Sequence, residues 1–405
     1  MNQELIQQSQ ALHPTFNSFR TRALIVAVVG IALTVFGYVD NADKAAFFSS
    51  YLLAFVYWIS LTLGCLIVLM IHHLAGGRWG FAIRRLLEAG TRTLPLMFVL
   101  SIPLAFGIHE LYEWSHEEVV AKDPVLQHKK AFLNPTFFVI RTALYFVIWG
   151  LIAFLLNRWS AQQDTTDQSH PTRRMQILSG PGTVVFVIVC TFAAVDWIMS
   201  LEPHWFSTIY AAIYIIGQIL FTWAFMILVG ASLSKRQPLD VLLTNERLRD
   251  LGTLMLGFVM LWAYTSFSQL LIIWAGNLPE EITWYYTRLR GGWENIGYLL
   301  VLLHFAFPFV LLVSSRIKAR IPILCTLAAG LIIMRLVDLF WITAPALGKP
   351  ELTINWMDIV IPVAFGGAWV FVFFGQLKKH SLVPLNDPRF NFEELAEEAK
   401  EDHHA

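Results

Sequence analysis

The chain has 405 residues, of which 56% are hydrophobic and only 14% are charged. Soluble proteins carry about 25% charged residues, so the composition excludes an ordinary soluble domain and indicates an integral membrane protein. Lysine plus arginine and aspartate plus glutamate number 29 each, and this balance gives no sign of a nucleic-acid partner.

Ten apolar segments are long enough to cross a bilayer, which takes about 20 mostly apolar residues in a helix. In chain order they are approximately 21–38, 47–73, 91–108, 134–156, 181–201, 207–232, 251–276, 295–315, 319–343 and 356–376. The run FAIRRLLEAG just before the third segment predicts a short amphipathic helix at the membrane surface. The sequence therefore predicts an all-α integral membrane protein with ten transmembrane helices.

The distribution of basic residues predicts the orientation of these helices. Loops on the N-terminal side of the membrane are richer in lysine and arginine than loops on the other side, and they include the pairs Arg84–Arg85 and Arg173–Arg174. Cytoplasmic loops carry the excess of basic residues in multi-pass proteins. Both termini are therefore expected in the cytoplasm, in agreement with an even number of spans.

The fifth and ninth segments resemble each other near their outer ends, where each carries an acid, then a tryptophan and a proline. Aligning Asp196 with Asp338 pairs segments two to five with segments six to nine. Apolar helices also resemble one another by chance, so the repeat depends on these two stretches. It divides the chain into a cytoplasmic N-terminal tail (1–20), a first transmembrane helix (21–45), two pseudo-symmetric four-helix bundles (46–202 and 203–345), a tenth transmembrane helix (346–377) and a cytoplasmic C-terminal tail (378–405).

The charged residues Arg141, Asp196, Arg335 and Asp338 lie within predicted spans, all four in the outer half of the membrane. A charge at this depth is costly, so each is expected to face a partner, a cavity or an ion path. Arg335 and Asp338 are three residues apart and share a helix face, and Asp196 could meet Arg141 from the neighbouring helix. These pairs either pin helices together or belong to a proton relay. The candidates that would continue a relay to the outer surface are Glu202, His204, and His109 or Glu110.

His304 is the only histidine near the middle of a predicted span. It is expected either to form a hydrogen bond within the packed helices or to face a quinone headgroup. A bis-histidine haem would need a second histidine at the same depth, and Cys65, Cys190 and Cys325 lie apart in separate apolar runs. We therefore expect no haem, metal or iron–sulfur cluster to be bound by this chain alone.

Two outer loops combine charged and aromatic residues: HELYEWSHEEVVAKDPVLQHKK (109–130) and NLPEEITWYYTRLRGGW (277–293). They are candidate docking surfaces for a partner outside the membrane. Ordinary solvated loops with interfacial aromatic residues are an equal alternative.

Three polar stretches at span ends carry a resemblance to a known family: DWIMSLEPHWFSTIY (196–210), NLPEEITWYYTRLRGGW (277–293) and RLVDLFWITAP (335–345). With the length and the ten spans, they make nearly the whole chain similar to the NrfD/PsrC-like membrane subunits of respiratory oxidoreductases. Within that family the chain looks most like the ActF subunits of alternative complex III. The resemblance implies two pseudo-symmetric four-helix bundles and a place in the bacterial inner membrane.

The resemblance also implies a multisubunit complex that oxidises menaquinol or a related quinol and passes electrons to a cytochrome c or an oxidase. Its other subunits would include a paralogous NrfD-like subunit, an iron–sulfur subunit and c-type cytochrome subunits, which would hold the haem c groups and iron–sulfur clusters. This chain would bind menaquinone or lipid at most. Because its third span offers His109 only at the outer end, proton conduction or scaffolding is favoured over a quinol site.

Two other functions fit the same pattern of spans. A ten-helix secondary transporter with internal repeats is the first, and such proteins place Gly or Pro at matching positions of the repeats. Pro103, Pro308 and Pro362 do not form a convincing matched pair. A quinol-binding subunit in its own right is the second alternative.

Overall fold

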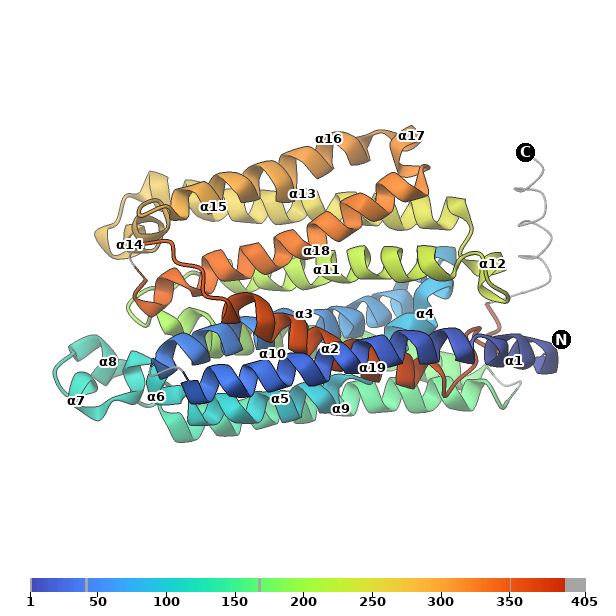
Figure 1. Ribbon diagram of the computed structural model, residues 1–405, viewed down its shortest axis with the longest axis horizontal. Coiled ribbons are helices and arrows are strands. Elements are labelled where there is room, and N and C mark those ends of the chain that lie inside the picture. The colour runs from blue at the N-terminus through green and yellow to red at the C-terminus, as the bar shows by residue number, and fades with distance from the viewer. Residues whose placement is uncertain (1, 41–42, 167–168, 350, 390–405) are drawn as a thin grey trace.

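A computed structural model of the chain describes residues 2–40, 43–166, 169–349 and 351–389. These ranges contain helices joined by short turns, and no β-strand occurs in them. Residues 390–405 of the predicted C-terminal tail lie outside the described residues. The long helices run side by side along the longest axis of the molecule (Figure 1).

Ten helical segments of the described chain are long and apolar enough to cross a membrane, and they match the ten predicted spans one for one. Their helices are α2 (His13–Asp40), α3 (Lys44–Ala75), α4 with α5 (Arg78–Thr91, Leu94–Phe106), α9 (Pro135–Gln163), α10 (His170–Trp197), α11 (Tyr210–Leu233), α13 (Asn245–Gly276), α15 with η3 and α16 (Trp293–Leu299, Leu300–Ala306, Phe307–Val313), α18 (Ile321–Thr343) and α19 (Met357–Leu377).

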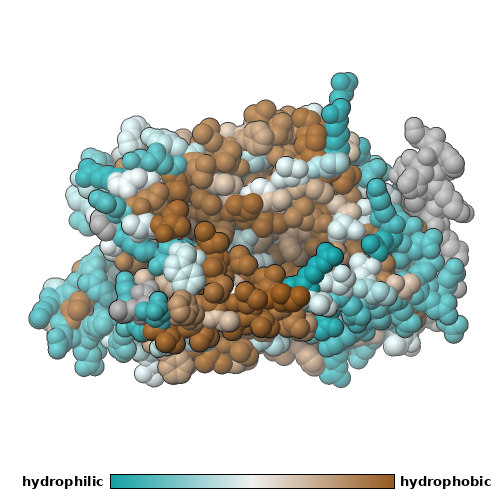
Figure 2. All heavy atoms as spheres, viewed as in Figure 1, coloured by the Kyte–Doolittle hydropathy of each residue, from teal (hydrophilic) through white to brown (hydrophobic). Residues whose placement is uncertain are grey.

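Short helices gather at the two ends of the bundle (Figure 1). At one end lie α6 (Ile108–Leu111), η1 (Glu113–Ser115), α7 (Glu117–Val120), α8 (Pro124–Lys129), η2 (Met199–Leu201), α14 (Pro279–Arg288) and η4 (Pro345–Leu347); at the other lie α1 (Asn2–Ala11), α12 (Leu239–Leu242) and α17 (Ser315–Lys318). Figure 2 shows a hydrophobic band across the middle of the visible face and hydrophilic residues towards both ends. This distribution, with all backbone groups of the band in helices, is that of a multi-pass membrane protein.

Local sequence signals set several helix boundaries. Asn134 precedes α9, and its side-chain oxygen accepts a hydrogen bond from a backbone N–H of the first turn, while Pro135 occupies the first helical position. Thr244 caps α13 in the same way, and α13 ends at Asn277 with a left-handed φ of 49°. The sequence alone therefore explains where these two spans begin or end.

We call the end of the bundle at which the N-terminus lies the inner end, and the opposite end the outer end. Two features at the inner end differ from the sequence-based expectation. Helix α10 begins at His170 rather than near residue 181, so the inner loop before it is reduced to residues 164–169. Helix α4 exists, but Arg84, Arg85 and Glu88 on its polar side are buried rather than exposed at a membrane surface. Burial of this face is possible because these charges bind one another and polar groups of α9.

Helix α3 forms the centre of the structure. Its residues are buried almost throughout, and it contacts α4, α5, α10, α11, α18 and α19. Gly64 lets α3 approach α11, because a Cβ atom there would lie 2.1 Å from Oγ1 of Thr222 and 2.4 Å from the carbonyl oxygen of Gln218. Small residues at such contacts allow membrane helices to pack closely.

Helices α2 and α19 form a pair along their whole length, and α19 joins this pair to α3. The opposite face of α2 exposes apolar side chains, including Ile25, Val28 and Val35. Exposed aliphatic residues over the full height of a span are expected where a helix faces lipid. The pair therefore lies at the edge of the bundle.

We predict that Gly64→Val will lower the stability of the chain by about 1–3 kcal/mol or more, because the added side chain would force α3 and α11 apart. Thermal unfolding of the purified protein in detergent will measure the change. Gly257→Val on α13 is the matched control, since a Cβ atom at Gly257 meets nothing within 4 Å. Equal unfolding midpoints for the two variants would contradict the prediction.

We also predict that cysteines introduced at Glu118 and Thr165 will react with an impermeant thiol reagent from opposite sides of the membrane. Both side chains are exposed, and they lie in the connections at opposite ends of α9. The positive-inside bias predicts periplasmic labelling at Glu118 and cytoplasmic labelling at Thr165. The orientation is wrong if both positions react from one side.

Candidate functional site

The first predicted ion pair joins α9 to α10 and is closed on every side. Arg141 donates from Nε and Nη2 to the two carboxylate oxygens of Asp196, at 2.8 and 2.7 Å, and Tyr145 donates to the same carboxylate at 2.6 Å. The third nitrogen of Arg141 donates to the carbonyl of Phe132 at 2.8 Å. Asp196 is completely buried. Each charged atom has a partner, so this cluster is arranged as a cross-link between two helices.

The second predicted pair lies within α18, and its charged atoms have fewer hydrogen-bond partners than those of the first pair. Arg335 donates from Nη1 to one oxygen of Asp338 at 2.5 Å. Its Nη2 donates to the carbonyl of Tyr214 over a longer distance of 3.3 Å. Nε of Arg335 is buried without a hydrogen-bond partner. Within the described ranges, the second oxygen of Asp338 accepts no hydrogen bond. Gly217 makes room for this guanidinium group, because a Cβ atom there would lie 2.2 Å from Nη1.

Asp338 lines a cavity of about 510 Å³ between α11, α13, α15–η3 and α18. Aromatic side chains form much of the wall, including Tyr210, Trp262, Trp284 and Trp341. The cavity therefore brings one intramembrane carboxylate to a space that a small molecule or water can occupy.

Glu202 binds Arg288, a partner that the sequence did not suggest. Arg288 donates from Nη2 to Glu202 at 2.8 Å and to the carbonyl of Ile342 at 2.7 Å, and it stacks on Trp284 at 3.9 Å from the ring centre. Arg288 is completely buried, although its position in an outer loop predicts exposure. Since Trp284 and Ile342 line the cavity, Arg288 lies directly behind its wall.

The other relay candidates lie on the outer surface in separate contacts. His204 forms a pair with Asp123 at 2.6 Å, and this hydrogen bond lowers the pKa of Asp123 below its ordinary value. His109 contacts Ser115 at 3.1 Å, and Glu110 is exposed. In the part of the chain that the structure describes, no hydrogen bond links these residues to Asp196 or Asp338, so they do not form one continuous relay.

His304 lies in the π-helical stretch η3 and is completely buried. Its ring stacks on Trp262 with 4.2 Å between ring centres, and neither ring nitrogen has a hydrogen-bond partner among the described residues. Trp262 lines the cavity, whereas His304 lies against Trp262 and is not part of the wall. The geometry therefore does not fit a direct hydrogen bond from His304 to a quinone in this cavity.

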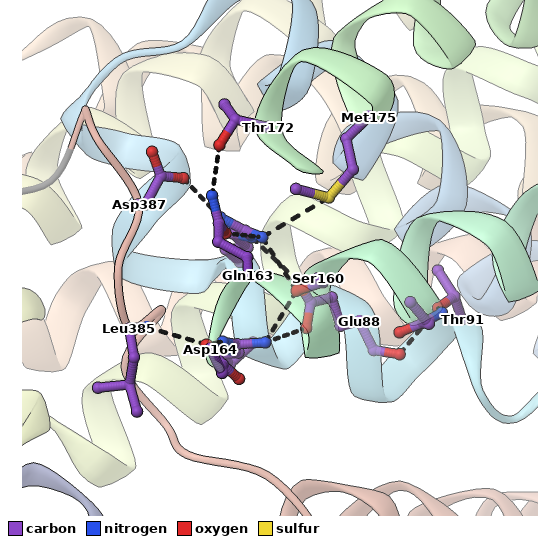
Figure 3. A network of polar contacts seen from close by, with 12 residues as sticks. Glu88, Thr91, Ser160, Gln163, Asp164, Thr172, Met175, Leu385 and Asp387 are labelled. Carbon is purple, nitrogen blue, oxygen red and sulfur yellow. Dashed lines mark hydrogen bonds and ion pairs between the residues drawn. The ribbon is translucent and has the colours of Figure 1, made fainter. Parts of the chain in front are cut away.

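A third polar cluster at the inner end was missed by the sequence analysis (Figure 3). Glu88 accepts from Nε of Arg84 at 3.0 Å, from Nη1 of Arg85 at 2.8 Å and from the hydroxyl of Ser160 at 2.6 Å. Arg84 also pairs with Asp387 at 2.7 Å, with both side chains fully buried. The i, i+3 and i+4 spacing in FAIRRLLEAG was the available signal, but the partners on α9 and near the C-terminus are not apparent from sequence.

The remaining members of this inner network come from α9, α10 and the residues that follow α9. Figure 3 labels them beside Ser160 and Glu88. They are Gln163, Asp164, Thr172 and Met175. Burial raises the pKa of Asp164 above its ordinary value although Arg85 lies beside it.

Compared with known proteins, the chain matches no family model and no curated protein. The functional argument therefore depends on the geometry of its buried polar groups. That geometry comprises one closed ion pair, one open ion pair at a cavity and a charged network at the inner end.

We predict that Asp196→Asn will destabilise the chain by about 3–5 kcal/mol, because it leaves Arg141 buried without its counter-charge. Tyr145→Phe should cost less, about 0.5–3 kcal/mol, since it removes one hydrogen bond and keeps the ion pair. Thermal unfolding and the yield of membrane-inserted protein will measure both. A larger effect of Tyr145→Phe than of Asp196→Asn would contradict a structural role for the pair.

Proposed function

We propose that the chain is an integral membrane subunit of a respiratory quinol-oxidising complex of the alternative complex III type. In this proposal it conducts protons and has no redox centre of its own. The main support is the contrast between its two intramembrane ion pairs. Asp196 is saturated by Arg141 and Tyr145, whereas Asp338 keeps an oxygen without a hydrogen bond at the wall of a cavity.

A carboxylate on a proton path must alternate between its neutral and charged forms. Asp338 meets this requirement better than Asp196, because one of its oxygens is open to an incoming proton and its arginine is held by fewer hydrogen bonds. Protonation of Asp196 would instead disturb a carboxylate whose two oxygens already accept three hydrogen bonds from Arg141 and Tyr145. We therefore assign the exchanging role to Asp338 and the structural role to Asp196.

A line of polar side chains leads from Asp338 towards the inner end. Tyr214, whose carbonyl binds Arg335, is followed by Gln218 and Thr222 at intervals of four residues, so the three share one face of α11. The hydroxyl of Tyr214 lies 3.2 Å from that of Ser60 on α3. Both polar atoms of the Gln218 amide are buried without partners. Such groups commonly bind ordered water, which would extend the path.

The helix contacts support two pseudo-symmetric four-helix bundles. In the proposed first bundle (46–202), α3 packs on α10 and α9 also packs on α10. In the proposed second bundle (203–345), α11 packs on α18 and η3 also packs on α18. The first helices of the two sets, α3 and α11, pack on each other. The same order of contacts in both halves is what a tandem repeat would produce.

The outer segment between α5 and α9 supports docking of partner subunits. Tyr112 donates to the carbonyl of Trp197 at 3.0 Å, and Trp114 donates to that of Ser200 at 3.0 Å. Lys129 adds a bond to the carbonyl of Pro203 at 2.6 Å. These bonds fix the segment against the end of α10 and the residues that follow it.

The proposed complex lies in the bacterial inner membrane, with both termini of this chain in the cytoplasm. Its partners are a paralogous NrfD-like subunit, an iron–sulfur subunit and c-type cytochrome subunits, which hold the iron–sulfur clusters and haem c groups. Menaquinol or a related quinol supplies the electrons. In this proposal the chain binds menaquinone or lipid at most. His304 lies behind Trp262 and does not provide a quinone ligand in the described arrangement.

We predict that Asp338→Asn will leave assembly and quinol oxidation in place and abolish most proton movement. Asn keeps the shape of the side chain but cannot take up and release a proton near neutral pH. The complex reconstituted in vesicles, with a pH-sensitive dye inside, will measure proton movement per electron transferred. Asp338→Glu is the matched variant that should restore part of it.

Two outcomes would contradict this assignment. The first is normal proton movement in Asp338→Asn. The second is loss of proton movement in Asp196→Asn with normal assembly, since that would place the exchanging group at the closed pair. Copurification of the chain without any redox subunit would contradict membership of the complex itself.

A further inference from the structure

The segment after α19 does not leave the molecule but folds back across its inner end. Leu382, Val383 and Leu385 are at most 5% exposed, so the segment is packed as part of the core. The backbone N–H of Leu382 donates to the hydroxyl of Ser9 at 3.2 Å. We call residues 381–389 the cap.

Charged contacts hold the cap against α4 and the end of α9. Asp387 pairs with Arg84 at 2.7 Å, and Arg389 donates back to Asp387 from its backbone at 3.0 Å and from its side chain at 3.2 Å. Asp164 accepts the backbone N–H of Leu385 at 3.0 Å. Figure 3 shows Leu385 and Asp387 on one strand of chain that passes beside the inner network.

Burial alone would raise the pKa of Asp387, but hydrogen bonds from Arg389 and the charge of Arg84 hold it below its ordinary value. Asp387 therefore remains charged at neutral pH, and the pair with Arg84 acts as a latch. Because both side chains are buried, loss of one partner would leave the other charge uncompensated.

Two histidines near the inner end of α3 have no role in the contacts described so far. His72 and His73 on α3 are completely buried, and none of their four ring nitrogens has a hydrogen-bond partner among the described residues. Their ring centres are 5.5 Å apart. A pair of imidazoles with free nitrogens can accept a proton at one nitrogen and release it from the other.

The cap reaches this pair through one aromatic ring. The guanidinium group of Arg389 lies over Phe81 at 5.5 Å, and Phe81 in turn meets His72 edge to face at 5.0 Å. Phe81 is therefore the one ring that lies between Arg389 of the cap and His72 in this chain of contacts.

We infer that His72 and His73 form the inner proton-exchange site of the chain and that the cap, latched by Asp387 on Arg84, closes this site from the inner aqueous phase. The site lies on α3, towards the inner end from the polar line that includes Ser60 and Gln218. Opening of the cap would admit water and protons, and closure would isolate the buried path. The use of the site for proton passage rests on the function proposed above, whereas its closure by the cap does not.

Accessibility of the histidines tests the closure directly. Full-length protein in lipid nanodiscs is treated with diethyl pyrocarbonate, which acylates accessible neutral imidazole nitrogens, and peptides are quantified by mass spectrometry. His204, which is half exposed, reports full reactivity, and the buried His304 reports the intact membrane core. The variants are Asp387→Asn and a chain ending at His380. Asp123→Asn is the matched control, because it removes a carboxylate from an ion pair at the opposite end.

In the wild type, the His72–His73 peptide should react slowly while His204 reacts fast. The peptide should remain slow in Asp123→Asn, which also removes the hydrogen-bond partner of His204. Asp387→Asn should increase its labelling at least tenfold, and the shortened chain should increase it further, with His304 still protected in both. Unchanged labelling in Asp387→Asn and in the shortened chain would overturn the closure. If the shortened chain exposes His304 as well, Asp387→Asn alone decides the question.

Proton movement in reconstituted vesicles then separates the two proposals. His72→Gln and His73→Gln should each reduce it severalfold if the pair exchanges protons, while assembly and quinol oxidation remain. Faster histidine labelling in Asp387→Asn together with normal proton movement in both glutamine variants would keep the cap and refute the proton-exchange site. Loss of proton movement in Asp338→Asn with normal movement in both glutamine variants would refute the inner site and keep the proposed function.

Discussion

The cost of a charge inside the bilayer determines how the polar residues of this chain are arranged. An isolated charge at the centre of a span is disfavoured by about 2.5–3.5 kcal/mol even on the gentler insertion scale. Each buried carboxylate considered above is accordingly bound to an arginine: Asp196 to Arg141, Asp338 to Arg335, Glu88 to Arg84 and Arg85, and Asp387 to Arg84. The helices must approach at the depths and angles that make these pairs, and the glycines at Gly64 and Gly217 permit that approach.

The pairs differ in what they leave free, and this difference is more informative about function than their number. A saturated pair such as Arg141–Asp196 resists any change of protonation, because proton uptake would release an arginine into a closed interior. A pair with one free oxygen at a cavity can change its protonation without rearranging two helices. Charged residues of the same type, at similar depth and in corresponding predicted spans, therefore serve different physical roles.

The sequence predicts the spans well because the length of an apolar run is a local property, and each of the ten runs forms a transmembrane segment. It also predicts the Arg335–Asp338 pair, since both residues lie on one helix. It does not predict Arg288 as the partner of Glu202, because the two residues belong to separate connections with α11 and α13 between them, and the sequence does not say how those connections meet. The early start of α10 was masked by its polar first turns, although Pro171 at the first positions of the helix was a usable signal. The inner network was missed because its members come from four distant segments.

The two pseudo-equivalent pairs also differ in how they restrain movement. Arg141 and Asp196 belong to different helices, so α9 and α10 cannot slide past each other without separating opposite charges. Arg335 and Asp338 belong to the same helix, and α18 carries its pair with it. The connection from this pair to α11 is a single 3.3 Å hydrogen bond to the carbonyl of Tyr214. One half of the molecule is thus pinned at this depth by an ion pair between two helices, whereas in the other half the ion pair does not itself join α18 to a neighbouring helix.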